Sequence, residues 1–409
     1  MELKSKVALS SSLGATFAWY DFTIFNLAIA LVFPQVFFPD MGYLIPILIF
    51  AVGFLARPLG GIIYGSLGDR LGRKKTLVAT LYLTGITTTL IGLLPTHADI
   101  GIAATVALIL ARILQTVAFG GEWAAASTMI VEYHAQDHNR GLLAGLVSSG
   151  WAAANIMAAL VFLIVTSFGD AFFLQWGWRI PFLLSVILLI IGVYIRVRVL
   201  ETPAFVEAKQ TQQLETHPVR EVFRNYFRPL VTGALAIQLA ASWMYVILIF
   251  GFGYLLQNSL ATRAELTQVQ FTMSWVLLVA LIFFGWLGDR IGRYRLFVFG
   301  ALTSLVLLWP VISWLQQGQV WLALSAMIVL ACPAFVSAPA LFSEMFPTRV
   351  RQTGSGIGYN MGLVLAGCVP LAAQHITQIT GDITNLVWLF TAISLLSLAA
   401  SMRLKRYVT

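Results

Sequence analysis

Residues 65–75 read GSLGDRLGRKK, and residues 285–295 read GWLGDRIGRYR. Seven of the eleven positions are identical, and the two segments lie 220 residues apart. A weaker similarity follows later in each half of the chain, where Glu132 precedes Arg140 and Glu344 precedes Arg349. Two similar halves in tandem predict a pair of parallel structural repeats.

The composition places these repeats in a membrane. Hydrophobic residues make up 59% of the 409 residues and charged residues only 10%, and the mean hydropathy is +0.86. Soluble domains carry about 25% charged residues, and disordered chains are polar. The composition therefore excludes a soluble protein and predicts a polytopic membrane protein.

The apolar segments are long enough to span a bilayer, which needs about 20 apolar residues for each helix. Polar breaks divide the chain into twelve such segments, at residues 10–38, 43–67, 76–95, 101–131, 141–168, 178–200, 229–257, 266–287, 296–316, 319–344, 353–376 and 383–402. We therefore predict an all-α polytopic membrane protein with 12 transmembrane helices in two six-helix halves. The halves are residues 1–200 and 229–409, and a charged cytoplasmic linker, residues 201–228, joins them.

The positive charges predict the orientation. Of the 25 Lys and Arg residues, about 21 fall on the side that holds both termini and the linker, and Arg196 is counted among them. The other side has only Arg179 and Arg263, and Arg57 and Arg112 lie within spans. Because cytoplasmic loops carry the excess of positive charge, both termini are predicted to be cytoplasmic.

Six further motifs narrow the identification. They are WYDF at residues 19–22, RPLGG at 57–61, ARILQ at 111–115, GGEW at 120–123, GWRIPF at 177–182 and ETP at 201–203. Together with the doubled G-x-L-G-D-R-x-G-R segment, they make the chain resemble the major facilitator superfamily, and within it the metabolite:proton symporters, whose members carry proline and betaine, 2-oxoglutarate, citrate or shikimate. One departure is Thr116, where the family pattern has glycine.

The resemblance implies a proton-coupled symporter that imports a small carboxylate-bearing metabolite, such as an organic acid, amino acid or betaine, by alternating access. It implies a monomer in the bacterial inner membrane, with the substrate, protons and lipid as partners and with no nucleic acid, cofactor, metal or enzymatic activity. Three alternatives remain open: an exporter, a carrier of a larger carboxylate such as an iron chelator, and a non-transporting receptor with the same fold.

Four charged side chains fall within the predicted spans of the first half: Asp21, Arg57, Arg112 and Glu122. A charge in hydrocarbon costs at least about 2.5–3.5 kcal/mol, so each is expected to face a cavity or a partner. A structural alternative has Asp21 neutralised by Arg57 or Arg112, and Glu122 hydrogen-bonded near the glycines beside it.

In the functional interpretation, Arg112 is the first candidate to bind a substrate carboxylate and Arg57 the second, because a guanidinium fits a carboxylate through two hydrogen bonds. Asp21 and Glu122 are the candidate proton sites. The four charges sum to zero, so an anionic substrate would favour the entry of a proton with it. The neutral candidates for the cavity are Tyr20, Gln115, Gln238, Trp243, Tyr245 and Asn360. Trp243 and Tyr245 have ordinary packing as their alternative role.

The two repeat segments predict a gate at the cytoplasmic side. Asp69 and Asp289 are each expected to cap a helix of the opposite half and to pair with Arg73 or Arg293. Glu132 and Glu344 resemble the acidic partners of this cluster in the superfamily. The candidate gating residues are Gly68, Asp69, Arg70, Arg73, Glu132, Gly288, Asp289, Arg293 and Glu344.

Overall fold

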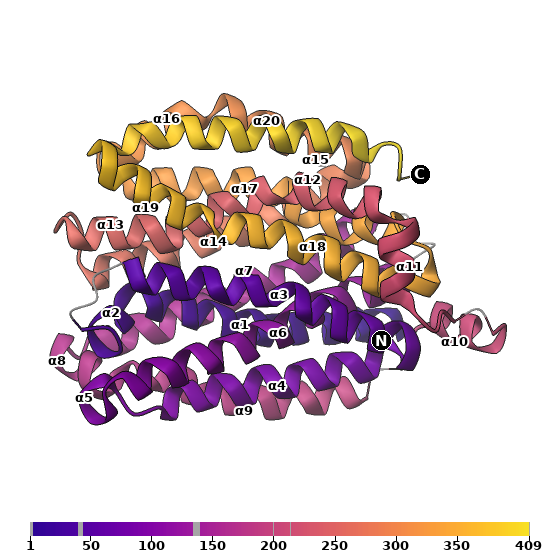
Figure 1. Cartoon of the computed structure of the whole chain (residues 1–409), viewed down its shortest axis with the longest axis horizontal. Helices are drawn as coiled ribbons and strands as arrows, with labels where there is room; N and C mark the ends of the chain where they lie inside the picture. The colour runs from indigo at the N-terminus through magenta and orange to yellow at the C-terminus, as the bar shows by residue number, and fades with distance from the viewer. Residues whose placement is uncertain (1–2, 40–43, 134–139, 199, 213, 409) are drawn as a thin grey trace.

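A computed structural model describes residues 3–408 except 40–43, 134–139, 199 and 213. In this described part every regular element is a helix. Long helices lie side by side in one bundle, as Figure 1 shows. The prediction of an all-α fold is confirmed.

The first half of the chain supplies the helices coloured indigo to magenta in Figure 1. They are α1 (Leu3–Leu31), α2 (Phe33–Val36), α3 (Leu44–Leu71), α4 (Arg73–Leu93), α5 (His97–Ile100), α6 (Ile102–Tyr133), α7 (Arg140–Thr166), α8 (Asp170–Phe172), η1 (Phe173–Gly177) and α9 (Arg179–Val197). Two short helices, α10 (Pro203–Gln210) and α11 (Pro218–Asn225), follow within the predicted linker.

The second half supplies the helices coloured pink to yellow. They are α12 (Phe227–Tyr245), η2 (Val246–Gly251), α13 (Phe252–Gln257), α14 (Arg263–Ile291), α15 (Arg293–Val306), α16 (Leu308–Gln316), α17 (Val320–Glu344), η3 (Thr348–Val350), α18 (Arg351–Gly367), α19 (Val369–Thr380), η4 (Ile383–Asn385) and α20 (Leu386–Leu404). The helices of the two halves form two groups in Figure 1. We call the end of the bundle with α10 and α11 the linker end, and the end with α2, α5 and α8 the far end.

The number of spans is close to the predicted one. Among the described residues, ten helical segments are long and apolar enough to cross a membrane, and an eleventh appears when α15 and α16, bent by 50°, are taken as one span. The predicted twelfth is α1, a helix of 29 residues that contains Asp21 and Asn26 and falls outside this set. The count of twelve and the position of the termini stay predictions.

Glycines bring the two halves into backbone contact near the linker end. A Cβ added to Gly61 of α3 would lie 2.8 Å from the Gly356 backbone of α18, and one on Gly65 would lie 2.8 Å from Thr353 Cα. In the pseudo-equivalent position, a Cβ on Gly145 of α7 would lie 2.7 Å from the Leu281 carbonyl of α14. Because no side chain fits there, the helices pack closely enough for polar groups of one half to reach the backbone of the other.

Candidate functional site

Arg57 lies in α3 and is fully buried. Its Nε donates a hydrogen bond to Oδ1 of Asn360, in α18 of the other half, at 3.0 Å. The guanidinium lies over the ring of Phe119 at 4.7 Å, with Phe54 at 5.2 Å and Phe22 at 5.4 Å from their ring centroids. Within the described structure, Nη1 and Nη2 have no partner in hydrogen-bond geometry, although the Tyr245 hydroxyl lies close enough to interact with the guanidinium. Arg57 therefore links the two halves through one nitrogen and leaves two buried donors unused.

Arg112, in α6, is also fully buried, but its terminal nitrogens are occupied. Nη1 donates to Gln115 Oε1 at 2.7 Å, and Nη2 donates to Asn26 Oδ1 at 3.4 Å. The guanidinium lies 3.8 Å from the centroid of the Phe25 ring. Among the described residues, Arg112 Nε has no hydrogen-bond partner. The geometry thus leaves more donors free on Arg57, the second candidate from sequence, than on Arg112, the first.

Asp21 is held by a hydroxyl rather than by a cation. Ser185 of α9 donates to its Oδ1 at 2.5 Å, and the Asp21 carboxyl is almost completely buried. Among the described residues, no Lys or Arg nitrogen lies within 4 Å of this carboxyl. An Asp21 ion pair with Arg57 or Arg112, one of the two structural alternatives, is therefore wrong for this structure.

Glu122 pairs with Arg196, which the sequence does not place among the buried charges. Its Oε1 lies 2.5 Å from Nη2 of Arg196, and both side chains are at most 5% exposed. Arg196 Nη1 also donates to the Leu77 carbonyl at 3.0 Å. The charge pattern places Arg196 on the side of the termini and not among the buried charges, but its side chain, in the last turn of α9, turns inward beside Gly14, where a Cβ would lie 2.5 Å from Arg196 Nε.

This pair adds Arg196 to the four charges that the sequence places within the spans. Among the described residues, the buried charged side chains are four arginines and four carboxyl groups: Arg57, Arg73, Arg112, Arg196, Asp21, Asp69, Glu122 and Glu132. With Glu122 paired to Arg196, Arg57 and Arg112 remain beside the Asp21 carboxyl, and these three groups carry one positive charge in excess when Asp21 is ionised.

The neutral candidates divide into central and peripheral ones. The Tyr245 ring of α12 lies 4.6 Å from Phe54 and 6.5 Å from Phe22, the rings that also contact Arg57. Asn360 also donates to the Gly120 carbonyl at 2.7 Å. We call Phe22, Phe54, Arg57, Arg112, Phe119, Tyr245 and Asn360 the central cluster.

Other candidates lie in the packing around this cluster. The Tyr20 hydroxyl donates to the Pro181 carbonyl at 2.9 Å and fixes α1 to α9. Trp243 stacks on Phe390 of α20 at 4.3 Å between centroids, which agrees with its packing alternative. Gln115 Nε2 donates to Thr88 Oγ1 at 2.7 Å. Gln238 is buried in α12, and its backbone carbonyl accepts a hydrogen bond from Ser242 Oγ.

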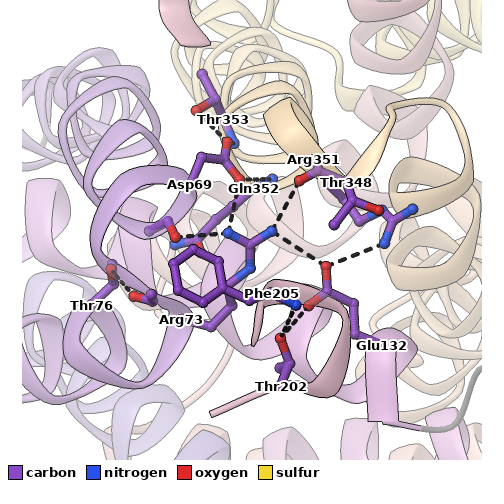
Figure 2. A network of polar contacts seen from close by, with 12 residues as sticks. Asp69, Arg73, Thr76, Glu132, Thr202, Phe205, Thr348, Arg351, Gln352 and Thr353 are labelled. Carbon is purple, nitrogen blue, oxygen red and sulfur yellow. Dashed lines mark hydrogen bonds and ion pairs between the residues drawn. The ribbon is translucent and has the colours of Figure 1, made fainter. Parts of the chain in front are cut away.

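Asp69 caps a helix of the other half at the linker end, as the close view in Figure 2 shows. Its carboxylate accepts from the backbone N–H groups of Gln352 at 3.2 Å and Thr353 at 2.8 Å, and from Thr353 Oγ1 at 2.7 Å. Arg73 Nη1 lies 3.1 Å from Asp69 Oδ1. The first turn of α18 leaves such N–H groups without intrahelical partners, so a carboxylate stabilises it. The expected cap and pairing of Asp69 are present.

Arg73 and Glu132 extend this network across the halves (Figure 2). Arg73 donates to the Gly68 carbonyl at 2.7 Å and to the Thr348 carbonyl, in the other half, at 3.1 Å. Glu132 Oε1 lies 3.3 Å from Arg73 and 3.2 Å from Arg351. We call Asp69, Arg73, Glu132, Arg351 and Thr353 the linker-end network.

The ETP motif completes this network. Thr202 Oγ1 donates to Glu132 Oε2 at 2.6 Å and also caps α10 by accepting from the Phe205 N–H at 3.3 Å. Glu201 accepts from the backbone N–H of Arg73 at 3.1 Å and of Lys74 at 3.3 Å, at the start of α4. The motif had no assigned role in the sequence analysis. Its residues fix the linker to the gate candidates.

The second copy of the repeat is similar but more exposed. Asp289 Oδ2 accepts from the Leu142 N–H, in the first turn of α7, at 2.8 Å. Arg293 pairs with Glu344 at 3.2 Å, with side chains 20% and 26% exposed, whereas those of Arg73 and Glu132 are at most 1% exposed. A Cβ on Gly288 would lie 3.2 Å from Leu296 within the same half. Arg70 is exposed, and no contact in the described part of the chain joins it to the linker-end network.

Two arginines predicted to lie opposite the termini cap helices at the far end. Arg263, which begins α14, donates from Nε to the Leu31 carbonyl of α1 at 2.8 Å and from Nη1 to Asp170 at 2.7 Å. Arg179 donates to the Gly92 carbonyl at 2.8 Å. A cavity of about 1060 Å³, lined by residues of both halves, lies beside Arg263. The structure therefore has contacts between the halves at both ends.

Comparisons with known proteins agree with this architecture. The family model of the Major Facilitator Superfamily matches residues 11–261, and that of sugar (and other) transporters matches residues 205–401. The chain is 34% identical to the shikimate transporter of Escherichia coli (strain K12), over 96% of this chain and 91% of that protein. It is 30% identical to the proline/betaine transporter of Salmonella typhimurium, over 98% and 83%.

A solved structure of a D-xylose–proton symporter superposes with a TM-score of 0.72 and covers 100% of this chain and 98% of that one. Its 18% identity supports the fold alone. An inner membrane metabolite transport protein of E. coli is 32% identical over 90% of this chain and 86% of its own. The chain is a multi-pass membrane transporter and belongs to the major facilitator superfamily.

Proposed function

We propose that the protein is a symporter that imports a small carboxylate-bearing metabolite together with a proton, with the linker end facing the cytoplasm. The observation that carries this proposal is the pair of buried, unused donors on Arg57. They lie where the two halves meet, because Nε of the same guanidinium bonds to Asn360.

A buried guanidinium without partners is costly, so a ligand with matching acceptors stabilises it. A carboxylate offers two oxygens in the geometry of the two terminal nitrogens. The rings of Phe22, Phe54 and Phe119 exclude water around this position. A metabolite bound there contacts the first half through Arg57 and lies beside Tyr245 and Asn360 of the second.

Asp21 is the better of the two candidate proton sites. Glu122 is engaged with Arg196, so a proton arriving there has to displace a buried ion pair. Asp21 is bonded to a hydroxyl, which can serve as a donor to the carboxylate or an acceptor from the acid. The guanidinium groups of Arg57 and Arg112 carry one positive charge more than the Asp21 carboxylate neutralises. When a bound anion neutralises that charge, the ionised form of Asp21 is stabilised less, so its carboxylate can take up a proton together with the substrate.

The linker-end network fits a gate that closes the cytoplasmic side. It connects α3, α4 and α6 of the first half with η3 and α18 of the second through hydrogen bonds that a separation of the halves must break. The moving bodies are then residues 1–200 and 229–409, joined by 201–228 as the linker. The named substrates of the relatives, shikimate, proline and betaine, each carry a carboxylate, which supports the proposed substrate class.

A binding experiment tests the carboxylate requirement. Shikimate, proline and betaine are titrated into the purified protein, and each is compared with its own uncharged or carboxylate-free derivative, such as the methyl ester of shikimate. We expect thermal stabilisation by at least one acid and none by its ester. Equal stabilisation by acid and ester would remove Arg57 from the role of carboxylate anchor.

A further inference from the structure

The linker helix α11 has two chemically different faces. Pro218 and Val222 are buried against the bundle, whereas Arg220, Phe223 and Arg224 are exposed. Positions i, i+3 and i+4 share one side of an α-helix. The outer side of α11 thus carries two guanidinium groups around an aromatic ring, and Figure 1 shows α11 at the linker end of the bundle.

The same character continues at the start of the next helix. Phe227, the first residue of α12, is 51% exposed, and Arg228 is exposed beside it. We call Arg220, Phe223, Arg224, Phe227 and Arg228 the arginine–phenylalanine face. Residues 227–257 form one of the segments long and apolar enough to cross the membrane. At 1.5 Å per residue, the eight residues of α11 extend about 12 Å, so the whole face stays close to the boundary of the hydrocarbon.

The inner side of α11 contacts the gating region. Glu221 Oε1 accepts from Arg349 Nη2 at 3.1 Å. Arg349 belongs to η3, which immediately precedes α18, the helix that Asp69 caps. The Tyr226 ring, between α11 and α12, lies 6.1 Å from the ring of Phe346 in the same region. A displacement of α11 would therefore also displace the start of α18, through the contacts of Glu221 and Tyr226.

We propose that the arginine–phenylalanine face binds the headgroups of anionic phospholipids at the linker-end surface of the membrane. Three guanidinium groups complement the phosphates of such lipids, and two exposed phenylalanines fit the boundary between headgroups and acyl chains. The face leads directly into the spanning segment that begins with α12, so it lies at the depth of the membrane surface, where its exposed side chains can meet headgroups. Lipid bound there fixes α11 in the position in which Glu221 holds Arg349.

The test measures contact with lipid directly and needs no transport. The native Cys332 and Cys368 are replaced by alanine, Phe223→Cys is labelled with bimane, and the protein is placed in vesicles that contain a lipid with a nitroxide near the headgroup. We expect bimane quenching to rise at least twofold when phosphatidylglycerol replaces 30% of the phosphatidylcholine. We expect 0.5 M salt to reverse most of that rise.

Charge variants separate specific binding from mere proximity. The triple substitution Arg220→Gln, Arg224→Gln, Arg228→Gln should abolish the effect of phosphatidylglycerol. The matched triple Arg290→Gln, Arg295→Gln, Arg403→Gln removes three exposed arginines from the same end of the bundle and should leave it intact. Quenching that is equal in the two lipid mixtures, or an unchanged response in the first triple variant, would overturn the proposal. Size-exclusion profiles confirm that both variants are folded.

Discussion

Asp69→Asn is the substitution with the most definite structural consequence. The Asp69 carboxylate is fully buried and accepts three hydrogen bonds from Gln352 and Thr353. An asparagine keeps one acceptor oxygen for Thr353 but turns an NH₂ group toward Arg73, whose Nη1 lies 3.1 Å from Oδ1 in the native chain. Thus one helix-capping bond and one buried ion pair are lost together.

The size of the effect follows from these losses. The Asp69–Arg73 pair lies within the first half and persists when the halves separate, so its loss does not favour either state. The bonds to Gln352 and Thr353 exist only while the linker end is closed. A hydrogen bond to a charged group contributes about 1.5–3 kcal/mol, and each 1.4 kcal/mol is a factor of ten. Loss of the bond from Gln352 should therefore shift the equilibrium between closed and open linker ends by about 10-fold to 100-fold toward the open form.

Cysteine labelling measures this shift. Ala124 of α6 is buried and lies where a Cβ on Gly356 of the other half would be 2.9 Å from its own Cβ. In a chain without native cysteines, Ala124→Cys should react with a water-soluble maleimide between 10-fold and 100-fold faster when Asp69→Asn is added. A parallel Asp69→Asn protein keeps the buried Cys332 as its only cysteine. Cys332 should remain unreactive, and its labelling would show that the protein has unfolded.

Two results would refute this reasoning. Labelling of Ala124→Cys at the parental rate in the Asp69→Asn protein would mean that the cap does not hold the end closed. A larger effect from Asp289→Asn than from Asp69→Asn would also contradict it, because the Arg293 and Glu344 pair is more exposed than its counterpart and exposed pairs contribute less.

Three further predictions concern the central cluster and the far end. Arg57→Lys should weaken binding of the substrate by about 1–3 kcal/mol in calorimetry, since it loses the two-pronged donor, and Arg112→Lys should cost less; the opposite order would make Arg112 the anchor. Asp21→Asn should retain exchange of substrate across vesicles but lose accumulation driven by a pH gradient, and retained accumulation would exclude Asp21 as the proton site. Arg263→Gln should speed hydrogen exchange in the first turn of α14. The increase should be only severalfold, because the partner Asp170 is 64% exposed and such pairs contribute at most about 1 kcal/mol. Unchanged exchange would show that Arg263 does not hold the far end.

The fold and one gate were predictable from sequence because each rests on a local pattern. Apolar segments of the length of a bilayer and a doubled motif determine the helices and their pairing. Asp69 follows this logic too. Its neighbours Gly65 and Gly68 have no side chains that would keep α18 away, so a short carboxylate reaches the N–H groups of that helix.

The partners inside the bundle were not predictable because they depend on which way each helix face points. Arg196 lies near the end of the predicted span 178–200, where an arginine usually extends to the membrane surface, yet α9 presents it to Glu122 inside the bundle. The phenylalanines around Arg57 come from three helices and are indistinguishable in sequence from those that face lipid. For the same reason Trp243 looked like a cavity residue, whereas it stacks on Phe390.

The most direct test of the proposed symport is uptake into proteoliposomes under an imposed pH gradient. The vesicles contain the purified protein, are one pH unit more alkaline inside, and are held at zero membrane potential with valinomycin and equal potassium. If one proton is carried with each carboxylate, this gradient allows the carboxylate to accumulate up to about tenfold inside the vesicles. We predict accumulation that collapses when a protonophore is added and is absent in Asp21→Asn. Uptake that merely equilibrates, and that is the same with and without the gradient, would contradict proton-coupled import.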